Sequence, residues 1–200
     1  MDQSGLILRV IPYSDNGRII KCLTEAHGLQ AYFIRGSKKS RNSGFVQTGT
    51  YIAFTLNERP SKMPSIKDCQ PDQNFSSAPL PHKAFGVWFF TLELLSKSLE
   101  DGFSIPGLRR TIDLYYTHLS HGSISCSPAT PAILLATAFG IWDTTTPISA
   151  SNGSLIEDLT TLGIAHVSSD DGEHDVFHTI VNRFKAHFGI QKLDSLVLLG

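Results

Sequence analysis

Residues 27–41 read HGLQAYFIRGSKKSR, a predicted strand that runs directly into a strongly basic loop. Leu29 to Ile34 is rich in aromatic and branched residues and follows a glycine, which is typical of a strand that leaves a tight turn. Gly36 ends the run. The loop holds four cations within seven residues, Arg35, Lys38, Lys39 and Arg41. Such a cluster needs either bulk water or a polyanion, because like charges repel one another.

The charge of the whole chain conceals a basic N-terminal part. The formal net charge is -1 over 200 residues. Residues 1–70 hold ten lysines and arginines against five acids, whereas residues 71–200 hold seven against thirteen. A basic unit of this kind is typical of domains that meet phosphates. The alternative for the loop alone is an ordinary solvated turn.

Short strands separated by turn residues occupy the first 70 residues. Besides 29–34, the predicted strands are 5–11, 18–24, 45–56, with a bend or bulge at Gly49, and 63–69. A turn over 12–17 joins the first two. Five short strands with such turns predict a closed OB-type barrel over residues 1–75.

A Pro, Asp, Asn and Ser-rich stretch over 71–81 predicts a linker, and helical patterns follow it. The predicted helices cover 83–99, about 106–119, about 127–141, a segment opened by a capping box at Ser154–Glu157, and a final helix that ends at Gly189. The fold class is therefore α+β, with an all-α domain over 76–200.

Several classes of protein have no support in the sequence. Cys22, Cys69 and Cys126 are odd in number and widely spaced, which argues against disulfides and a cysteine zinc site. No segment approaches the roughly 18 apolar residues of a membrane span, so we expect a cytoplasmic protein. Glycine-rich phosphate loops and nucleophile elbows are missing from the sequence. We expect no cofactor and no enzymatic activity.

Two rival interpretations stay open. His174 and His178 are four residues apart in a predicted helix, the spacing of two zinc ligands, although no glutamate holds the position between them that a metalloprotease motif requires. A metal-dependent hydrolase would use this pair. The second rival is an OB-fold adaptor that binds only proteins, its basic loop facing an acidic partner.

Aromatic residues lie among the basic positions of the first domain. OB-folds hold single strands by stacking bases on exposed aromatic rings. Phe33 and Phe54 are expected to fill the barrel. Tyr13 lies in a predicted turn and is the better candidate for base stacking.

Both ends of the chain carry distinctive stretches: GLILRVIPYSD at 5–15, LTEAHG at 23–28, RGSKKS at 35–40 and FKAHFGIQKLDSL at 184–196. In these stretches the chain resembles the RecO family of DNA repair and recombination mediators. The chain departs from the family in two places. Residues 140–153 have no cysteine, so the four-cysteine zinc module of many members is missing, and Val46 to Gly49 replaces the usual LQPF segment.

The resemblance implies an OB-fold and a helical domain that bind single- and double-stranded DNA and anneal complementary strands. It also implies three partners: RecR, the acidic tail of single-stranded DNA-binding protein, and, indirectly, RecA, which would be loaded onto coated DNA. A nucleoid-associated location follows from these partners.

Basic residues of the first domain are the candidate DNA contacts: Arg9, Arg18, Lys21, Arg35, Lys38, Lys39 and Arg41. A partner tail with an apolar end needs a pocket with a cation at its rim. Arg109 and Arg110, beside Leu108 and Ile112, form the only adjacent basic pair in the acidic domain, and we expect the tail there. A solvated helix face is the alternative for this pair.

Overall fold

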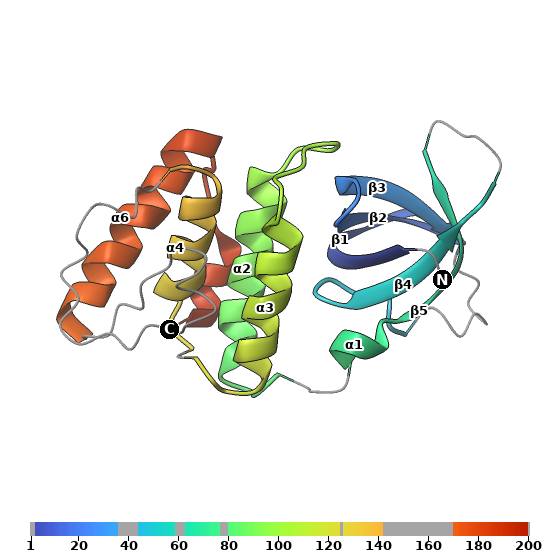
Figure 1. Cartoon of the computed structure of the whole chain (residues 1–200). Helices are drawn as coiled ribbons and strands as arrows, with labels where there is room; N and C mark the ends of the chain where they lie inside the picture. The colour runs from blue at the N-terminus through green and yellow to red at the C-terminus, as the bar shows by residue number, and fades with distance from the viewer. Residues whose placement is uncertain are drawn as a thin grey trace. The chain divides into compact units, whose positions relative to one another are not determined.

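The computed structural model describes residues 3–35, 44–58, 63–76, 80–124, 126–141 and 170–199. The chain groups into two compact units (Figure 1). The first combines Met1–Pro79 with Leu99–Asp113, and the second combines Leu80–Ser98 with Leu114–Gly200. Residues 99–113 therefore pack with the barrel, although the sequence places them within the predicted helical domain. None of the helices in the described part of the chain is both long and apolar enough to cross a membrane.

Five strands form a closed barrel in the first unit, as the sequence predicts. They are β1 (Gln3–Ser14), β2 (Gly17–Thr24), β3 (Gly28–Arg35), β4 (Tyr51–Leu56) and β5 (Ser65–Pro71). Their order around the barrel is β1-β2-β3-β5-β4. Only β3 and β5 pair in parallel; the other neighbours are antiparallel. This closed arrangement confirms an OB-type barrel.

Some element boundaries differ from the prediction. β1 continues to Ser14 through Pro12, since only Asp15 and Asn16 form the turn to β2. β4 begins at Tyr51, six residues later than predicted, because Gly49 takes a left-handed φ of 86° in a turn that a strand cannot contain. A short helix, α1 (Gln73–Ser76), lies within the predicted linker.

Alternate residues of the strands fill the barrel. Ile20 and Tyr32 are opposite each other on β2 and β3, and both are fully buried. The buried cluster consists of Ile7, Ile20, Cys22, Tyr32, Ile34, Val46, Ile52, Phe54, Ile66 and Cys69. The rings of Tyr32 and Phe54 meet edge to face, 5.1 Å apart. Phe54 therefore fills the interior, as predicted.

Residues 102–104 pack against the start of β3. The backbone N–H of Leu29 donates to the carbonyl of Phe103 over 3.2 Å, and the N–H of Gly102 donates to the carbonyl of Leu29 over 2.7 Å. Gly28 has a φ of 62°, and a Cβ there would lie 2.3 Å from the Phe103 carbonyl oxygen. Residues 102–104 can approach β3 this closely only because Gly28 has no side chain.

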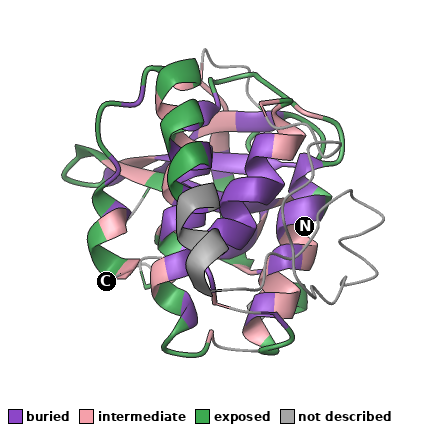
Figure 2. Ribbon diagram, turned by 90° about the vertical axis from the view of Figure 1, so that its left-hand side faces the viewer, coloured by how far each residue is buried: buried purple, intermediate pink, exposed green. Residues whose placement is uncertain are grey.

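The second unit is helical. It contains α2 (Ala84–Ser98), the C-terminal part of α3 (Leu108–Ser120), α4 (Ala129–Ala138), α6 (Asp170–Phe188) and the 3-10 helix η2 (Asp194–Leu199). Buried residues, purple in Figure 2, gather in the middle of the helices, and exposed residues, green, lie at the periphery. Aromatic pairs such as Phe90–Phe177 and Phe139–Phe184 join the helices. The helix predicted to begin at Ser154 lies outside the described residues.

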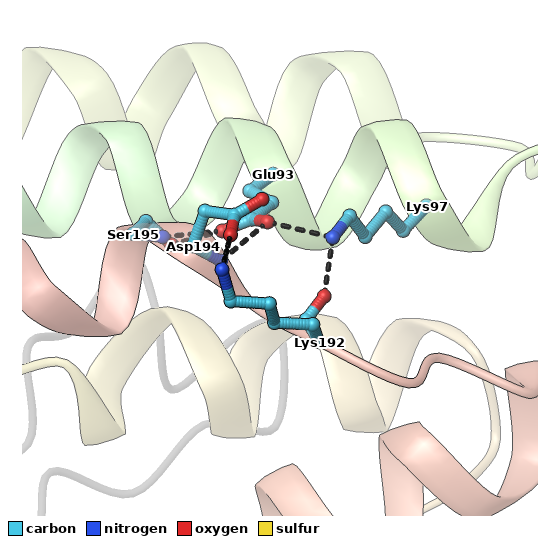
Figure 3. A network of polar contacts seen from close by, with 5 residues as sticks. All are labelled: Glu93, Lys97, Lys192, Asp194 and Ser195. Atoms are coloured by element: carbon cyan, nitrogen blue, oxygen red, sulfur yellow. Dashed lines mark hydrogen bonds and ion pairs between the residues drawn. The ribbon is translucent and has the colours of Figure 1, made fainter.

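Glu93 of α2 holds the start of η2 (Figure 3). Its carboxylate accepts the backbone N–H groups of Asp194 and Ser195, each over 2.8 Å, and also the Ser195 hydroxyl. Lys97, one turn along α2, forms an ion pair with Glu93 over 2.8 Å and donates to the Lys192 carbonyl. The carboxylate satisfies backbone donors that open the 3-10 helix, as a capping side chain does.

Candidate nucleic-acid interface

The strand register places three predicted DNA contacts on the outside of the barrel. Residues directly opposite each other in a ladder share one face of the sheet. Arg9 lies opposite Lys21, and Gly17 lies opposite Arg35. These positions alternate with the buried interior positions of β2 and β3, so their side chains lie on the outer side. We call Arg9, Ile11, Tyr13, Ile19, Lys21, Phe33 and Arg35 the outer face.

Apolar groups occupy the middle of the outer face. Ile19 is paired with both Ile11 of β1 and Phe33 of β3, and all three side chains are only partly buried. Phe33 is therefore outside the barrel, and the expectation that it fills the interior is wrong. Strand alternation decides this, because its neighbours Tyr32 and Ile34 take the inward positions.

Tyr13 and Phe33 form an aromatic pair at the open end of this face. Their ring centroids are 5.9 Å apart with an interplanar angle of 78°, an edge-to-face contact. Tyr13 is 68% exposed. A Cβ on Gly17 would lie 2.6 Å from the Phe33 ring, so the ring rests directly on the backbone of β2. The sequence singles out Tyr13, but it does not reveal the Phe33 ring beneath.

The cations of the outer face differ in their surroundings. Arg9 and Arg35 are exposed. Lys21 is half-buried and forms an ion pair with Asp101 over 2.9 Å. The Asp101 carboxylate therefore competes with any other anion for Lys21, whereas Arg9 and Arg35 present their charges to solvent.

The remaining predicted contacts lie elsewhere. Arg18 is opposite Ile34, a buried core residue, so its side chain leaves β2 on the inner side, at the rim of the barrel. It does not share a face with Arg9 and Arg35. Lys38, Lys39 and Arg41 lie outside the described residues, in the segment that directly follows Arg35 in the sequence.

The two arginines predicted to bind a partner tail have different environments. Arg109 is only 5% exposed. It forms an ion pair with Asp113 over 2.7 Å and donates to the carbonyls of Leu23 and Ser4, over 3.0 and 3.3 Å. Arg110 is exposed. The first arginine is therefore committed to contacts inside the unit, and the second presents its charge to solvent.

Arg109 also lies under a cleft of about 500 Å³ in the first unit. Its guanidinium carbon is 5.1 Å from the centre of the Tyr51 ring, and that ring is stacked on Phe75 at 4.2 Å. Burial raises the pKa of the Asp113 carboxyl above its ordinary value, and the Arg109 guanidinium opposes the rise. The cleft is thus lined by the Arg109 guanidinium, which is buried and already bound to Asp113 and to backbone carbonyls of the same unit.

The titratable groups inside the barrel are held neutral. Burial raises the pKa of the Cys22 thiol to about 12 and that of Cys69 to about 11. The same cause, reinforced by the nearby Cys22, raises the pKa of Tyr32 to about 12. A thiol in this state is a poor nucleophile. These groups act as packing residues.

Of the two histidines that a metal-dependent hydrolase would use, the structure describes the side chain of one. His178 is exposed on α6, and the side chain of His174 lies outside the described residues. Within the described ranges, no three His, Cys, Asp or Glu side chains gather as a metal site would require.

The fold and the outer face together define a class: an OB-type barrel with cations and aromatic rings on the outside of β1, β2 and β3. OB-folds commonly bind ligands on the face of their second and third strands. Residues 1–75 match the family model for the Recombination protein O N terminal domain. The N-terminal barrel is therefore similar in sequence to the N-terminal domain of the RecO family.

A curated relative agrees with this assignment. The DNA repair protein RecO of Geobacter sulfurreducens is 26% identical over 125 residues. The match covers 62% of this chain and 51% of that protein. The chain thus spans about half the length of the curated relative that it matches.

Proposed function

We propose that the protein acts in DNA repair and recombination as a non-enzymatic, nucleic-acid-binding mediator. The observation that carries the proposal is the shared placement of Arg9, Lys21 and Arg35 on one side of a RecO-type barrel. The strand that bears Arg35 continues in sequence into Lys38, Lys39 and Arg41. Together these cations supply a basic surface that suits the phosphates of single- and double-stranded DNA.

Phosphate neutralisation explains how such a surface would promote annealing. Two complementary strands repel each other through their phosphates, and cations that bind both strands lower this repulsion. Binding through phosphates also carries little sequence information. We therefore propose annealing without sequence preference, with RecR and RecA loading as the wider context and no cofactor requirement.

Salt dependence tests the proposal directly. A labelled oligo-dT strand and a labelled duplex would be titrated at several salt concentrations with the wild type, with Lys38→Ala/Lys39→Ala/Arg41→Ala and with Arg9→Ala/Arg35→Ala. Each lost phosphate contact should reduce the slope of log K against log salt by about 0.7 for single strands. The same variants should slow strand annealing.

A matched control separates the barrel from overall charge. Lys83→Ala/Lys185→Ala removes two cations from the helical unit and should leave the slope unchanged. Equal losses in the control would contradict a binding site on the barrel. No binding of either DNA at low salt would contradict the proposed function and favour the protein-only adaptor.

Partner binding has two candidate places. Because Arg109 is internally paired, Arg110 is the cation that remains available near the cleft. The helical unit offers an apolar patch of Phe85, Phe89, Val197 and Leu198, all exposed, on α2 and η2, which pack together. The apolar end of a tail would suit this patch, and Lys97 and Lys192 of the same unit, which form ion pairs with Glu93 and Asp194, would have to exchange these partners for the acidic groups of the tail.

The patch and the cleft can be distinguished by mutation. Binding of a synthetic acidic peptide with an apolar C-terminus would be measured with Phe89→Ser and with Arg110→Glu. Loss only with Phe89→Ser assigns the tail to the patch, and loss only with Arg110→Glu assigns it to the cleft. Unchanged binding in both variants would reject both places.

A further inference from the structure

The outer face carries an aromatic pair that phosphate binding does not require. Tyr13 is 68% exposed, although a ring of this size is usually covered in a stable domain. The same outer face carries the exposed cations Arg9 and Arg35 and the partly buried Ile11, Ile19 and Phe33. A ring between cations, on an apolar base, has the composition of a surface that binds unpaired nucleotides.

The position of the pair is set by the backbone beneath it. Phe33 lies against Gly17, where any side chain would collide with the ring, since the Cβ would be 2.6 and 2.8 Å from two of its carbons. Phe33 in turn contacts Tyr13, with the two ring centroids 5.9 Å apart. The Phe33 ring thus lies on the backbone at Gly17, and the Tyr13 ring makes an edge-to-face contact with Phe33 and extends outward from it.

The outer face is closed at one end and open at the other. At one end Lys21 forms an ion pair with Asp101, and β3 begins against residues 102–104. At the other end lie the β1–β2 turn, Tyr13 and Arg35. At the open end a polyanion therefore meets an exposed cation, Arg35, together with an exposed ring, whereas Arg9 lies farther along the face, opposite Lys21.

We propose that the open end of the outer face binds unpaired bases, with Tyr13 as the stacking residue, Phe33 and Gly17 as its support, Arg35 as the phosphate contact at that end, and Arg9 as a second phosphate contact farther along β1, opposite Lys21. This inference rests on the proposed nucleic-acid binding and adds a preference. In a duplex the flat sides of the bases are stacked on one another, so Tyr13 cannot reach them. The ring contributes to binding of single strands, whereas the cations contribute to both forms.

Tyr13→Ala isolates the stacking contribution. Affinity for oligo-dT should fall roughly 5- to 150-fold, the range for loss of one stacked base. Affinity for a duplex of equal length should stay within about twofold, and the salt slope should not change, because no phosphate contact is lost. Tyr13→Trp should restore single-strand binding. Phe103→Ala is the matched control, since Phe103 is also an exposed aromatic residue of the first unit, 52% exposed.

A second measurement reports contact rather than affinity. The chain has two tryptophans of its own, so the readout is the indole fluorescence of Tyr13→Trp in excess of the wild type. It should be quenched by oligo-dT and unaffected by duplex, whereas the excess fluorescence of Phe103→Trp should respond to neither. Gly17→Ala should reduce single-strand affinity without altering the slope, because it displaces the supporting ring.

The outcomes separate the inference from the function on which it rests. Salt-dependent binding of oligo-dT that is equal in wild type and Tyr13→Ala overturns the stacking role and leaves DNA binding intact. Equal losses for oligo-dT and duplex also overturn it, since they indicate a general disturbance. Failure of the wild type to bind any DNA overturns the proposed function itself.

Discussion

The Nη1 atom of Arg109 lies 3.0 Å from the backbone carbonyl oxygen of Leu23, 86 residues earlier in the sequence. The same guanidinium reaches the carbonyl of Ser4 and forms an ion pair with Asp113. The first turn of α3 is thereby joined to β1 and β2 by a single buried side chain.

Removal of this side chain should destabilise the protein. In Arg109→Ala the half-buried Asp113 loses the Arg109 guanidinium and two carbonyls lose a donor, so we expect a loss of about 3 kcal/mol in the free energy of unfolding. Urea unfolding followed by circular dichroism measures the change. The adjacent Arg110→Ala is the control and should stay within about 0.5 kcal/mol, because Arg110 is exposed. Equal losses in the free energy of unfolding for both variants would contradict the interpretation that Arg109 stabilises the contact of α3 with β1 and β2.

Glu93 should make the docking of η2 sensitive to acid. Burial raises the pKa of this carboxyl, but hydrogen bonds from Lys97, Ser195 and Asp194 outweigh it and lower the pKa to about 2, against an ordinary value of 4.5. A depressed pKa in the folded state contributes stability above the ordinary value, and this contribution is lost as the pH falls from about 4.5 toward 2.

Glu93→Gln measures that contribution. The wild type should be more stable than Glu93→Gln at pH 6, and the difference should shrink as the pH falls below about 4.5. Hydrogen exchange of the Asp194 and Ser195 amides provides a local readout, with faster exchange expected in the variant at pH 6. A difference in stability that stays constant from pH 6 to 2.5 would show that the charge of Glu93 is unimportant.

Asp101 should weaken nucleic-acid binding through its ion pair with Lys21, at 2.9 Å. Asp101→Asn frees this cation and removes a negative charge beside the outer face, so affinity for DNA should rise about two- to fivefold at low salt and converge with wild type at high salt. Stability should change by less than about 1 kcal/mol, since exposed ion pairs contribute little. Fluorescence polarisation of labelled oligo-dT measures the effect.

The control for Asp101 is a similar pair in the helical unit. Asp194 forms an ion pair with Lys192 over 2.6 Å, and Asp194→Asn should leave DNA affinity unchanged. An equal rise in both variants would indicate that net charge, rather than the position of Asp101, governs binding.

Gly28 should tolerate no side chain. Gly28→Ala combines a left-handed φ of 62° with a Cβ only 2.3 Å from the Phe103 carbonyl oxygen, and we expect a loss of about 2 kcal/mol or more. Gly102→Ala has a similar φ of 83° but no atom within 4 Å of the new Cβ, so its loss should be about 1 kcal/mol, from backbone strain alone. Equal losses in thermal unfolding would refute the close packing of residues 102–104 on β3.

The barrel was predictable because its signals are local. Branched and aromatic runs separated by glycine turns indicate strands, and the strand that ends at Arg35 was located within one residue at each end. The predicted strand over 45–56 was too long, since its apolar pattern continues across Gly49 and conceals the turn there. Val46, the apolar residue on the other side of that turn, still packs into the core.

The candidate site was predictable in composition and unpredictable in arrangement. Charge asymmetry identified the basic domain, and the list of cations follows from it. The face that each cation occupies depends on the pairing register, which a bulge between Ile7 and Arg9 alters in β1. Within β2 and β3, alternation decides the face: it puts Arg18 on the opposite side from Lys21, across from Ile34, and it turns Phe33 outward between Tyr32 and Ile34.

The sequence by itself determined the kind of elements, the order of barrel and helices, and the concentration of positive charge in the first 70 residues, since each depends on neighbouring residues along the chain. Tertiary structure decided which side chains meet: Tyr13 with Phe33 over Gly17, Lys21 with Asp101, and Arg109 with Leu23. These contacts join residues up to 86 positions apart. They depend on strand register and on the packing of residues 99–113 against the barrel, and no local pattern in the sequence carries that information.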